Sequence, residues 1–190
     1  MIKIVSTRFT NKTLSENRDY RSKHGIPCIY GSPQEFSPKI LYNTLIMVVE
    51  MNNELNQIEG IGLIYNHPNM EKYYNIYSDG NYNRYIYKSN YFIDRDILLR
   101  YNPKIVSIFD YILFKEKTHL KRGTGFTTIP EKLLHHKVCE TMDILNELKY
   151  MFKSQYSKNM DEIEREKQTE IEGQQIQGQQ IQEKQEQIIM

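Results

Sequence analysis

The chain has 190 residues, of which 39% are hydrophobic, and its formal net charge is +1. This length suits one domain with its own core and some additional sequence. No stretch reaches the roughly 18 to 20 apolar residues of a membrane span, and no basic start precedes an apolar run, so we expect neither membrane association nor a secretory signal. The two distant cysteines, Cys28 and Cys139, exclude a disulfide framework and favour a reducing, intracellular compartment.

The first forty residues predict an opening strand followed by a long polar segment. Residues 2–5 are rich in β-branched side chains, which favours a strand. Residues 10–40 are polar and contain two glycines and three prolines. We therefore expect a loop there, with one short helix as an alternative for part of it.

The middle of the chain predicts two neighbouring strands joined by a turn. Residues 45–51 form a continuous apolar run, as in a central strand that is buried on both faces. The polar residues 52–56 predict a turn, and residues 57–65 predict the returning strand. Gly60 and Gly62 in that strand indicate a bulge or a close approach of the backbone.

Residues 73–77 and 82–87 predict a further pair of strands. Asp79-Gly80 between them is a strong signal for a hairpin turn. We therefore expect a β-hairpin in this part of the chain.

Two helices are predicted in the second half. Residues 103–116 begin with Pro103 and place four apolar side chains on one face, although their β-branched and aromatic content leaves a strand as an alternative. Those side chains are Ile105, Ile108, Phe109 and Ile112. Pro130 suits the first turn of a long helix that runs to about residue 157, with Thr127 or Thr128 as its N-cap. The apolar stripe of this helix comprises Leu134, Val138, Leu145, Leu148 and Phe152, with Thr141 filling one gap.

The last thirty residues differ in composition from the rest. They hold eight of the 24 acidic and three of the 25 basic residues, which leaves a net charge of +6 on the first 160 residues. The direct repeat Gly-Gln-Gln-Ile-Gln occurs at residues 173–177 and 178–182, and its spacing produces no continuous apolar stripe. We expect residues 159–190 to be a disordered, low-complexity tail. A mildly basic body suits a polyanionic partner, and equally ordinary solubility.

These elements predict an α+β fold. We expect a small mixed β-barrel or curved sheet flanked by helices, followed by a long C-terminal helix and a disordered tail. Residues 1–128 would form the core domain. Residues 129–158 would form an amphipathic helix that packs on the core or on a partner, and residues 159–190 would form the tail.

Five stretches of the body, at residues 28–34, 49–53, 58–64, 77–85 and 121–125, resemble uncharacterised proteins of giant nucleocytoplasmic DNA viruses of the mimivirus type. The chain also contains no Ala, which agrees with an AT-rich coding sequence. The resemblance implies a viral protein that is located in the host cytoplasm, the virus factory or the virion. It implies no particular activity.

The order of the elements is similar, at the level of fold, to that of PUA-like domains of the EVE and ASCH types. The shared features are the opening strand, the polar segment, Val-Val-Glu-Met at residues 48–51 and Gly-Ile-Gly-Leu-Ile at residues 60–64. Such domains are small β-barrels that bind RNA or modified bases. The chain contains no Trp, so a Trp of their aromatic cage has no counterpart here.

Tyrosines and cations gather in one segment of the chain. Eight of the 15 tyrosines lie between Tyr65 and Tyr91. Aromatic rings beside cations on a sheet form a stacking platform for single-stranded nucleic acid. The residues predicted to form it are Tyr82, Arg84, Tyr85 and Lys88. Ordinary packing of tyrosines in a sheet is the alternative.

A second set of cations lies in the predicted loops. Lys121 and Arg122 open a turn with the sequence Lys-Arg-Gly-Thr-Gly, whose backbone N–H groups and cations suit a phosphate. An ordinary exposed turn is the alternative. We include Lys121 and Arg122 among the predicted nucleic-acid-binding residues. The N-terminal segment adds the basic residues Arg8, Arg18, Arg21 and Lys23.

No motif for catalysis or metal binding stands out. His135 and Cys139 are spaced i, i+4 on a predicted helix, but a zinc site needs further ligands. Asp94 and Asp96 suit an acid–base pair on a strand or, alternatively, the N-terminus of a helix. We expect no metal, no cofactor and no catalytic residues, with an enzyme acting on nucleotides or RNA as a third alternative.

The sequence thus favours a non-catalytic binding module that contacts RNA or single-stranded DNA through its tyrosine, arginine and lysine face. The alternative is a structural or interaction protein of a large DNA virus. Such a protein would assemble with itself or with another viral protein through residues 130–157.

Overall fold

A computed structural model describes residues 2–115, 119–140 and 142–156. The chain divides into two compact units, residues 1–147 and residues 148–190. All the described strands belong to the first unit. The described part of the second unit consists of the last residues of α5 (Ile144–Gln155) and of Tyr156, whose ring stacks on Phe152.

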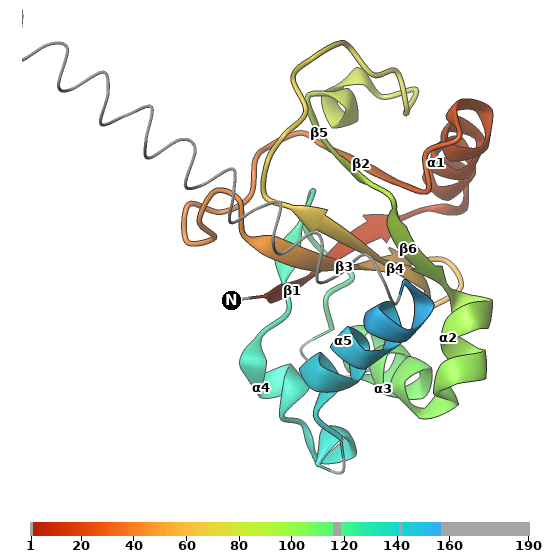
Figure 1. Ribbon diagram of the computed structural model, residues 1–190, viewed down its shortest axis with the longest axis vertical. Coiled ribbons are helices and arrows are strands. Elements are labelled where there is room, and N and C mark those ends of the chain that lie inside the picture. Colours follow the sequence, from red (N-terminus) through yellow and green to blue (C-terminus); the bar gives the residue numbers. More distant parts are fainter. Residues whose placement is uncertain (1, 116–118, 141, 157–190) are drawn as a thin grey trace, which may run out of the picture. The chain divides into compact units, whose positions relative to one another are not determined.

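Five strands form a central sheet in the order β6-β4-β3-β1-β7 (Figure 1). The strands are β1 (Lys3–Phe9), β3 (Leu45–Asn52), β4 (Gln57–Tyr65), β6 (Tyr91–Asp94) and β7 (Thr127–Thr128). β1 and β3 run parallel, and the other neighbours run antiparallel. The strands predicted at residues 2–5, 45–51 and 57–65 are therefore confirmed, and the first of them continues to Phe9.

β3 lies at the centre of this sheet because its sequence is apolar enough to be buried on both faces. All eight of its residues are buried, between β1 on one side and β4 on the other. The side-chain oxygen of Asn52 holds the following turn, because it accepts hydrogen bonds of 3.1 Å from the backbone N–H groups of Glu54 and Leu55. The predicted turn is confirmed. The register of the β3–β4 pair shifts beside Gly60, which confirms the predicted irregularity.

A second, two-stranded sheet replaces the predicted hairpin. β2 (Cys28–Ser32) lies in the segment predicted as loop and pairs antiparallel with β5 (Tyr85–Ser89). Residues 73–77 form no strand. Asp79-Gly80, predicted as the hairpin turn, instead opens the short 3-10 helix η1 (Gly80–Asn83).

The buried side chain of Asn83 explains why residues 73–77 form no strand. Its carbonyl oxygen accepts hydrogen bonds of 3.0 Å from the N–H groups of Ile76 and Tyr77, and its amide donates to the carbonyl of Tyr77 at 2.8 Å. These backbone groups must be satisfied once they are buried. The side chain of Asn83 thus satisfies backbone groups of Ile76 and Tyr77 that would otherwise bond to the partner strand of a hairpin.

α1 (Asn11–His24) occupies much of the segment that the sequence predicts as loop. Thr10 caps its N-terminus, and Gly25, with a φ of 62°, ends it in a left-handed conformation. Its buried residues are Leu14, Asn17 and Arg21. Only one of these three is apolar, so the hydrophobic periodicity that would have predicted a helix of this length is missing.

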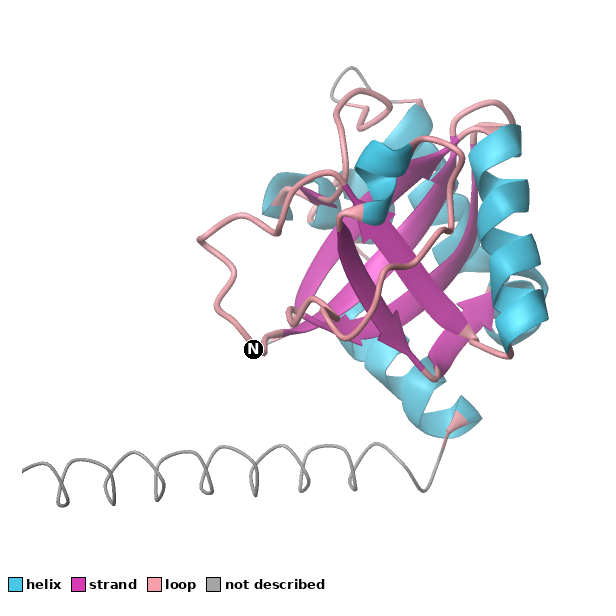
Figure 2. Ribbon diagram, turned by 90° about the horizontal axis from the view of Figure 1, so that it is seen from above, coloured by secondary structure: helices cyan, strands magenta, loops and turns pink. Residues whose placement is uncertain are grey.

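The helices and the second sheet cover the two faces of the central sheet (Figure 1, Figure 2). α1 and the β2–β5 pair lie on one face, and α2 (Arg95–Tyr101) and α3 (Pro103–Phe114) lie on the other. A hydrophobic cluster that includes Val5, Ile29 and Tyr87 fills the first of these two layers. The fold is therefore α+β, as predicted. The described strands do not close into the predicted barrel, because β6 and β7 remain as edges of the sheet.

α2 and α3 both begin at a side-chain cap. The carboxylate of Asp94 accepts from the N–H of Ile97 at 2.8 Å, and the side-chain oxygen of Asn102 accepts from the N–H of Lys104 at 3.1 Å. The four apolar residues predicted to share one face of α3, Ile105, Ile108, Phe109 and Ile112, are all buried. The helix predicted at 103–116 is confirmed over the strand alternative. Asp94 serves as a helix cap, in agreement with the second of its two predicted roles.

The segment predicted as one long helix, residues 130–157, is divided into shorter pieces. They are α4 (Glu131–Leu134), the 3-10 helix η2 (Lys137–Cys139) and α5. The helix ends because His135 leaves the helical conformation, and Asp143 starts a new helix by accepting from the N–H of Asn146 at 3.0 Å. Thr127 and Thr128, predicted as alternative N-caps, form β7 instead.

The predicted tail, residues 159–190, lies outside the described residues. None of the helices that the structure describes is long and apolar enough to cross a membrane.

Candidate nucleic-acid interface

The tyrosines between residues 65 and 91 divide into buried and partly exposed groups. Tyr74, Tyr77 and Tyr87 are 1%, 4% and 0% exposed and belong to the hydrophobic cluster. Tyr82 and Tyr85 are partly buried and pack against the same cluster. Packing in the core therefore accounts for three of the eight tyrosines, while the two predicted for stacking keep part of their rings at the surface.

Arg84 and Lys88 each lie near an aromatic ring, but at different places. Arg84 is exposed, and its guanidinium carbon lies 5.9 Å from the ring centroid of Tyr85. The Lys88 ammonium lies 3.5 Å from a carboxylate oxygen of Glu71 and 5.7 Å from the ring centroid of Tyr74. Three residues of a strand span about 10 Å, so Lys88 lies about that far along β5 from Tyr85.

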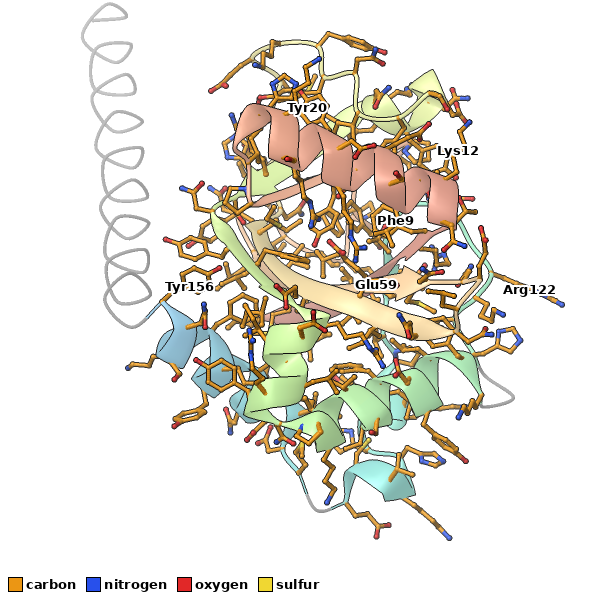
Figure 3. All side chains as sticks on the ribbon, turned by 90° about the vertical axis from the view of Figure 1, so that its right-hand side faces the viewer. Phe9, Lys12, Tyr20, Glu59, Arg122 and Tyr156 are labelled. Carbon is orange, nitrogen blue, oxygen red and sulfur yellow. The ribbon has the colours of Figure 1, made fainter. Side chains whose placement is uncertain are left out.

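The basic turn at residues 121–125 is anchored to the turn between β3 and β4. The ammonium of Lys121 donates to the side-chain oxygen of Asn56 at 2.6 Å. The carbonyl of Lys121 accepts from the side chain of Asn53 at 2.9 Å. Arg122 is exposed and projects from the surface (Figure 3). The turn is thus anchored through Lys121, and the exposed guanidinium of Arg122 can reach a ligand.

Two glycines give this turn a conformation that other residues rarely adopt. Gly123 and Gly125 have φ angles of 122° and 65°. The backbone N–H groups of Gly123, Thr124 and Gly125 donate to no acceptor in the described ranges of the chain. Successive N–H groups in a turn of this kind form a concave site for an anion.

A pocket of about 220 Å³ brings this turn together with the carboxyl end of β1 and the start of α1. Its polar side chains are Thr7, Arg8, Thr10, Thr13, Asn53, Tyr77 and Tyr82. Gly123 and Gly125 also line it, and none of its described lining residues is Asp or Glu. We call this site the Arg8 pocket.

The guanidinium of Arg8 uses only part of its hydrogen-bonding capacity. Its Nη1 donates to the carbonyl of Leu120 at 3.2 Å and to the hydroxyl of Thr127 at 3.0 Å, and its Nη2 donates to the carbonyl of Gly125 at 2.9 Å. A guanidinium has five N–H donors, so one hydrogen on Nη2 and the hydrogen on Nε remain. Nε is buried and has no acceptor among the described residues. Such a donor costs about 1–3 kcal/mol.

Arg8 differs from two other arginines of the N-terminal segment in its electrostatic environment. Arg18 forms an ion pair of 2.8 Å with Glu59, and Arg21 forms one with Glu50. The three described acceptors of Arg8 are all uncharged. Burial lowers the pKa of Arg8 from its ordinary value, yet an arginine stays protonated at neutral pH. The pocket therefore contains a positive charge that no carboxylate in its described lining compensates.

The structure brings together three of the six predicted nucleic-acid-binding residues. Tyr82 lines the Arg8 pocket, and Lys121 and Arg122 directly precede its Gly123. Arg84 and Tyr85 follow η1, close in sequence to Tyr82. Lys88 lies further along β5 and forms a different cluster, around Tyr74.

Sequence reasoning missed most of the remaining residues of the pocket. It placed Arg8 in the polar N-terminal segment, whereas Arg8 lies on β1. Thr10 and Thr13 form a capping box at the start of α1, a pattern that could have been found once the helix was recognised. Asn53 lies in the predicted turn, but nothing in that turn marks it as a ligand contact.

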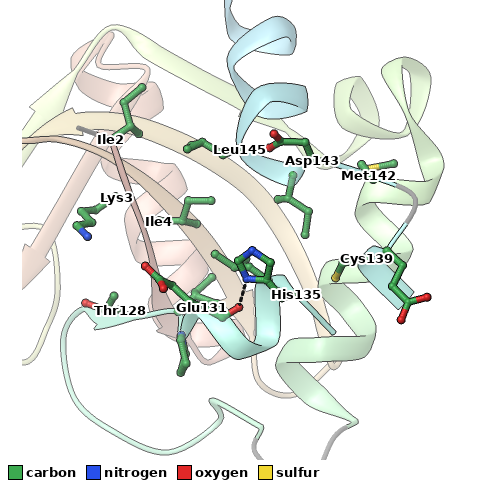
Figure 4. Close-up of a pocket in the computed structure, with 15 residues that line it drawn as sticks. Ile2, Lys3, Ile4, Thr128, Glu131, His135, Cys139, Met142, Asp143 and Leu145 are labelled. Atoms are coloured by element: carbon green, nitrogen blue, oxygen red, sulfur yellow. Dashed lines mark hydrogen bonds between the residues drawn. The ribbon is translucent and has the colours of Figure 1, made fainter. Parts of the chain in front are cut away.

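A larger cavity of about 810 Å³ lies between the start of β1 and the segment that follows β7 (Figure 4). Ile4 and Ile129 are buried in its wall. Nδ1 of His135 lies 2.8 Å from the carbonyl oxygen of Glu131. The cavity includes part of the segment 130–157 that the sequence predicts as a partner surface, which stays a prediction. Within the described ranges, no three His, Cys, Asp or Glu side chains are grouped so that they could hold a metal ion.

No protein-family model, curated protein or solved structure matches the chain. We therefore infer function from the residues of this chain alone.

Proposed function

We propose that the protein is a non-catalytic module that binds RNA or single-stranded DNA through the Arg8 pocket and its basic rim. The observation that carries this proposal is the guanidinium of Arg8, which has no described acidic partner in a pocket shared with Tyr82 and the turn at 121–125. Lys121 and Arg122 add positive charge for contacts with phosphates. Tyr82, together with the exposed Arg84 and the partly buried Tyr85, offers surfaces on which bases stack.

The charge of the body supports the same proposal. The net charge of +6 on the first 160 residues favours the approach of a polyanion. Both cysteines are free and buried, and on this basis we propose a reducing, intracellular location.

The test is the binding of the full chain to fluorescein-labelled, mixed-sequence RNA and DNA single strands at several salt concentrations. Phosphate contacts release counterions, so the affinity should fall with salt, with a log–log slope of about 0.7 per contacted phosphate. Arg122→Ala removes one such contact and should reduce the slope by about 0.7. The matched control is Arg100→Ala, which removes an exposed arginine of α2 on the opposite face of the sheet and should leave the slope unchanged.

A double variant separates stacking from charge. Arg84→Ala combined with Tyr85→Ala should weaken binding by about tenfold, because stacking of one base contributes about 1–3 kcal/mol. This loss should persist at high salt, unlike the effect of Arg122→Ala. Absence of binding at low salt, or an affinity that does not change with salt, would contradict the proposed function.

A further inference from the structure

We propose that the Arg8 pocket binds a phosphomonoester, namely the terminal phosphate of a nucleotide or of a nucleic-acid chain. This inference rests on the proposed function, since it uses the same pocket, and it goes further by naming the group that enters. The size of the pocket, its unused hydrogen-bond donors and its charge carry the inference.

The size of the pocket suits one small group. Its volume is about 220 Å³. Sites that enclose a drug-sized ligand usually have a volume of roughly 300–1,000 Å³. The pocket is therefore smaller than such sites and suits a compact group, such as the terminal phosphate of a nucleotide or of a chain.

The unused donors match the oxygens of a phosphate. After its three hydrogen bonds to the protein, Arg8 retains one N–H on Nη2 and the buried N–H on Nε. The N–H groups of the turn from Gly123 to Gly125 add donors that bind no described acceptor. Tyr82 lines the pocket and carries a hydroxyl group. A terminal phosphate presents three strong acceptor oxygens, and charge-assisted bonds from a guanidinium to such oxygens are among the strongest in proteins.

The charge of the site favours a monoester over a diester. A phosphomonoester carries about −1.5 to −2 charges at pH 7, and a diester carries one. Arg8 lies in the pocket, and Lys121 and Arg122 precede its glycine turn. Glu54 lies in the turn between β3 and β4, and its carboxylate accepts hydrogen bonds of 2.9 and 2.6 Å from the backbone N–H and the side-chain amide of Asn11 at the start of α1. Glu54 does not line the pocket.

Arg8 also has a structural role, because its three hydrogen bonds join β1 to residues 120–127. A neutral amide donor could bind the same carbonyl and hydroxyl oxygens without the desolvation of a charge. The structural role also leaves the buried Nε–H without an acceptor. An anionic ligand would account for the charge and for the hydrogen of Nη2 that has no described acceptor.

The test compares three forms of one labelled oligonucleotide, with a 5′-phosphate, with a 3′-phosphate and with hydroxyl groups at both ends. We expect the full chain to bind one of the phosphorylated forms at least tenfold more tightly than the form with hydroxyl ends. AMP should compete with it, and adenosine should not. Arg8→Lys replaces the planar set of donors by one ammonium and should reduce the preference below threefold, whereas Arg100→Ala should leave it unchanged.

A second measurement does not depend on how well a variant folds. The amide resonances of Gly123, Thr124 and Gly125 in the unmodified protein should shift when AMP or inorganic phosphate is added. They should not shift with adenosine. The effect should weaken as the pH falls below about 6, where a phosphomonoester loses its second charge.

The outcomes separate this inference from the proposed function. Equal binding of the three oligonucleotides, with no effect of AMP on the glycine turn, would overturn the phosphomonoester site and leave nucleic-acid binding in place. Failure of all three to bind, together with AMP-induced shifts at the turn, would overturn the proposed function and support the phosphate site. Failure of both measurements would overturn both.

Discussion

Glu50 carries its charge in the interior of the first unit. Its side chain is 0% exposed, and that of its ion-pair partner Arg21 is 9% exposed. The hydroxyl of Tyr30 donates to the same carboxylate at 2.9 Å, and the guanidinium of Arg21 lies 4.4 Å from the ring centroid of Phe92. Burial by itself lowers the pKa of Arg21, but the neighbouring groups Glu50, Tyr30 and Cys28 together outweigh this effect and raise it. The arginine of this pair is therefore charged throughout the neutral range.

Removal of one partner should show how much the pair matters to stability. In Arg21→Met, Glu50 is left as a buried charge without its partner, and we expect the free energy of unfolding to fall by about 3–5 kcal/mol. Urea denaturation at pH 7 measures it. The control is Lys12→Met, which breaks the exposed pair between Lys12 and Glu16 and should cost less than about 1 kcal/mol. Equal losses in the two variants would show that burial does not determine the strength of the pair.

The thiol of Cys28 should make the fold sensitive to alkaline pH. Burial raises the pKa of this thiol from 9.0 to about 11. The thiol of the unfolded chain therefore loses its proton first as the pH rises. Its contribution to the free energy of unfolding is fully present below about pH 9 and is lost between about pH 9 and 11. The contribution amounts to about 3 kcal/mol. Urea denaturation at pH 8 and at pH 10.5 should show this loss in the unmodified protein and a smaller loss in Cys28→Ala. The same pH dependence in both would assign the effect to the buried tyrosines, such as Tyr87, whose pKa burial raises to about 12.

At the scale of elements, the stability of α1 depends more on the residues that cap its two ends than on an apolar face. Gly25 ends it with a φ of 62°, and no atom lies within 4 Å of the position that a Cβ would take. Gly25→Ala therefore introduces conformational strain without a clash, and the free energy of unfolding should fall by about 1 kcal/mol. Gly80 also has space around it but has no positive φ, so Gly80→Ala should leave stability unchanged or raise it by about 0.5 kcal/mol. Urea midpoints compare the two, and an equal effect would rule out the helix end as the cause.

Elements that apolar residues define could be predicted from the sequence, whereas α1 and β2 could not. β3 and α3 each present an apolar run or stripe, and both begin within one residue of the predicted position. α1 is attached instead through polar groups, such as the amide of Asn17, which donates to the carbonyl of Ile29 at 2.8 Å. β2 contains Gly31, follows a proline, and pairs with a strand more than fifty residues away. Neither property produces a local pattern.

The residues of the candidate site could be predicted only where the type of residue by itself indicates a contact with nucleic acid. Tyr82 and the basic glycine turn stand out in the sequence itself. Arg8 does not, because it differs from Arg18 and Arg21 only in having no described carboxylate partner, and this difference requires knowledge of the partners of the other two. Those partners lie 41 and 29 residues further along the chain. Sequence alone therefore could not show which of these three arginines has no carboxylate partner among the described residues.

At the scale of the whole fold, the two sheets approach each other closely at Gly62. A Cβ at this position of β4 would lie 2.6 Å from the sulfur of Cys28 and would also overlap the hydroxyl of Tyr30. Gly62→Ala should push the layers apart and reduce the stability by about 1–3 kcal/mol, and the melting temperature by about 2–4 °C for each kcal/mol. Thermal unfolding and near-ultraviolet circular dichroism measure the two effects. A normal melting temperature, like that expected for Gly80→Ala, would show that the layers tolerate the extra methyl group.

The pairing of β1 has a consequence for the order in which the protein is made. β1 precedes every other described strand in synthesis, yet its neighbour β3 follows about 43 residues later and β7 more than 120 residues later. At about 5–20 residues per second, the ribosome needs roughly 6–24 seconds to reach the second neighbour. During this interval the strand has an unpaired edge that other nascent chains could bind. Arg8 meets Gly125 only after 117 further residues, so a chain still being translated at that point has no ligand pocket. The Arg8 pocket is therefore complete only after almost the whole folded body has been synthesised.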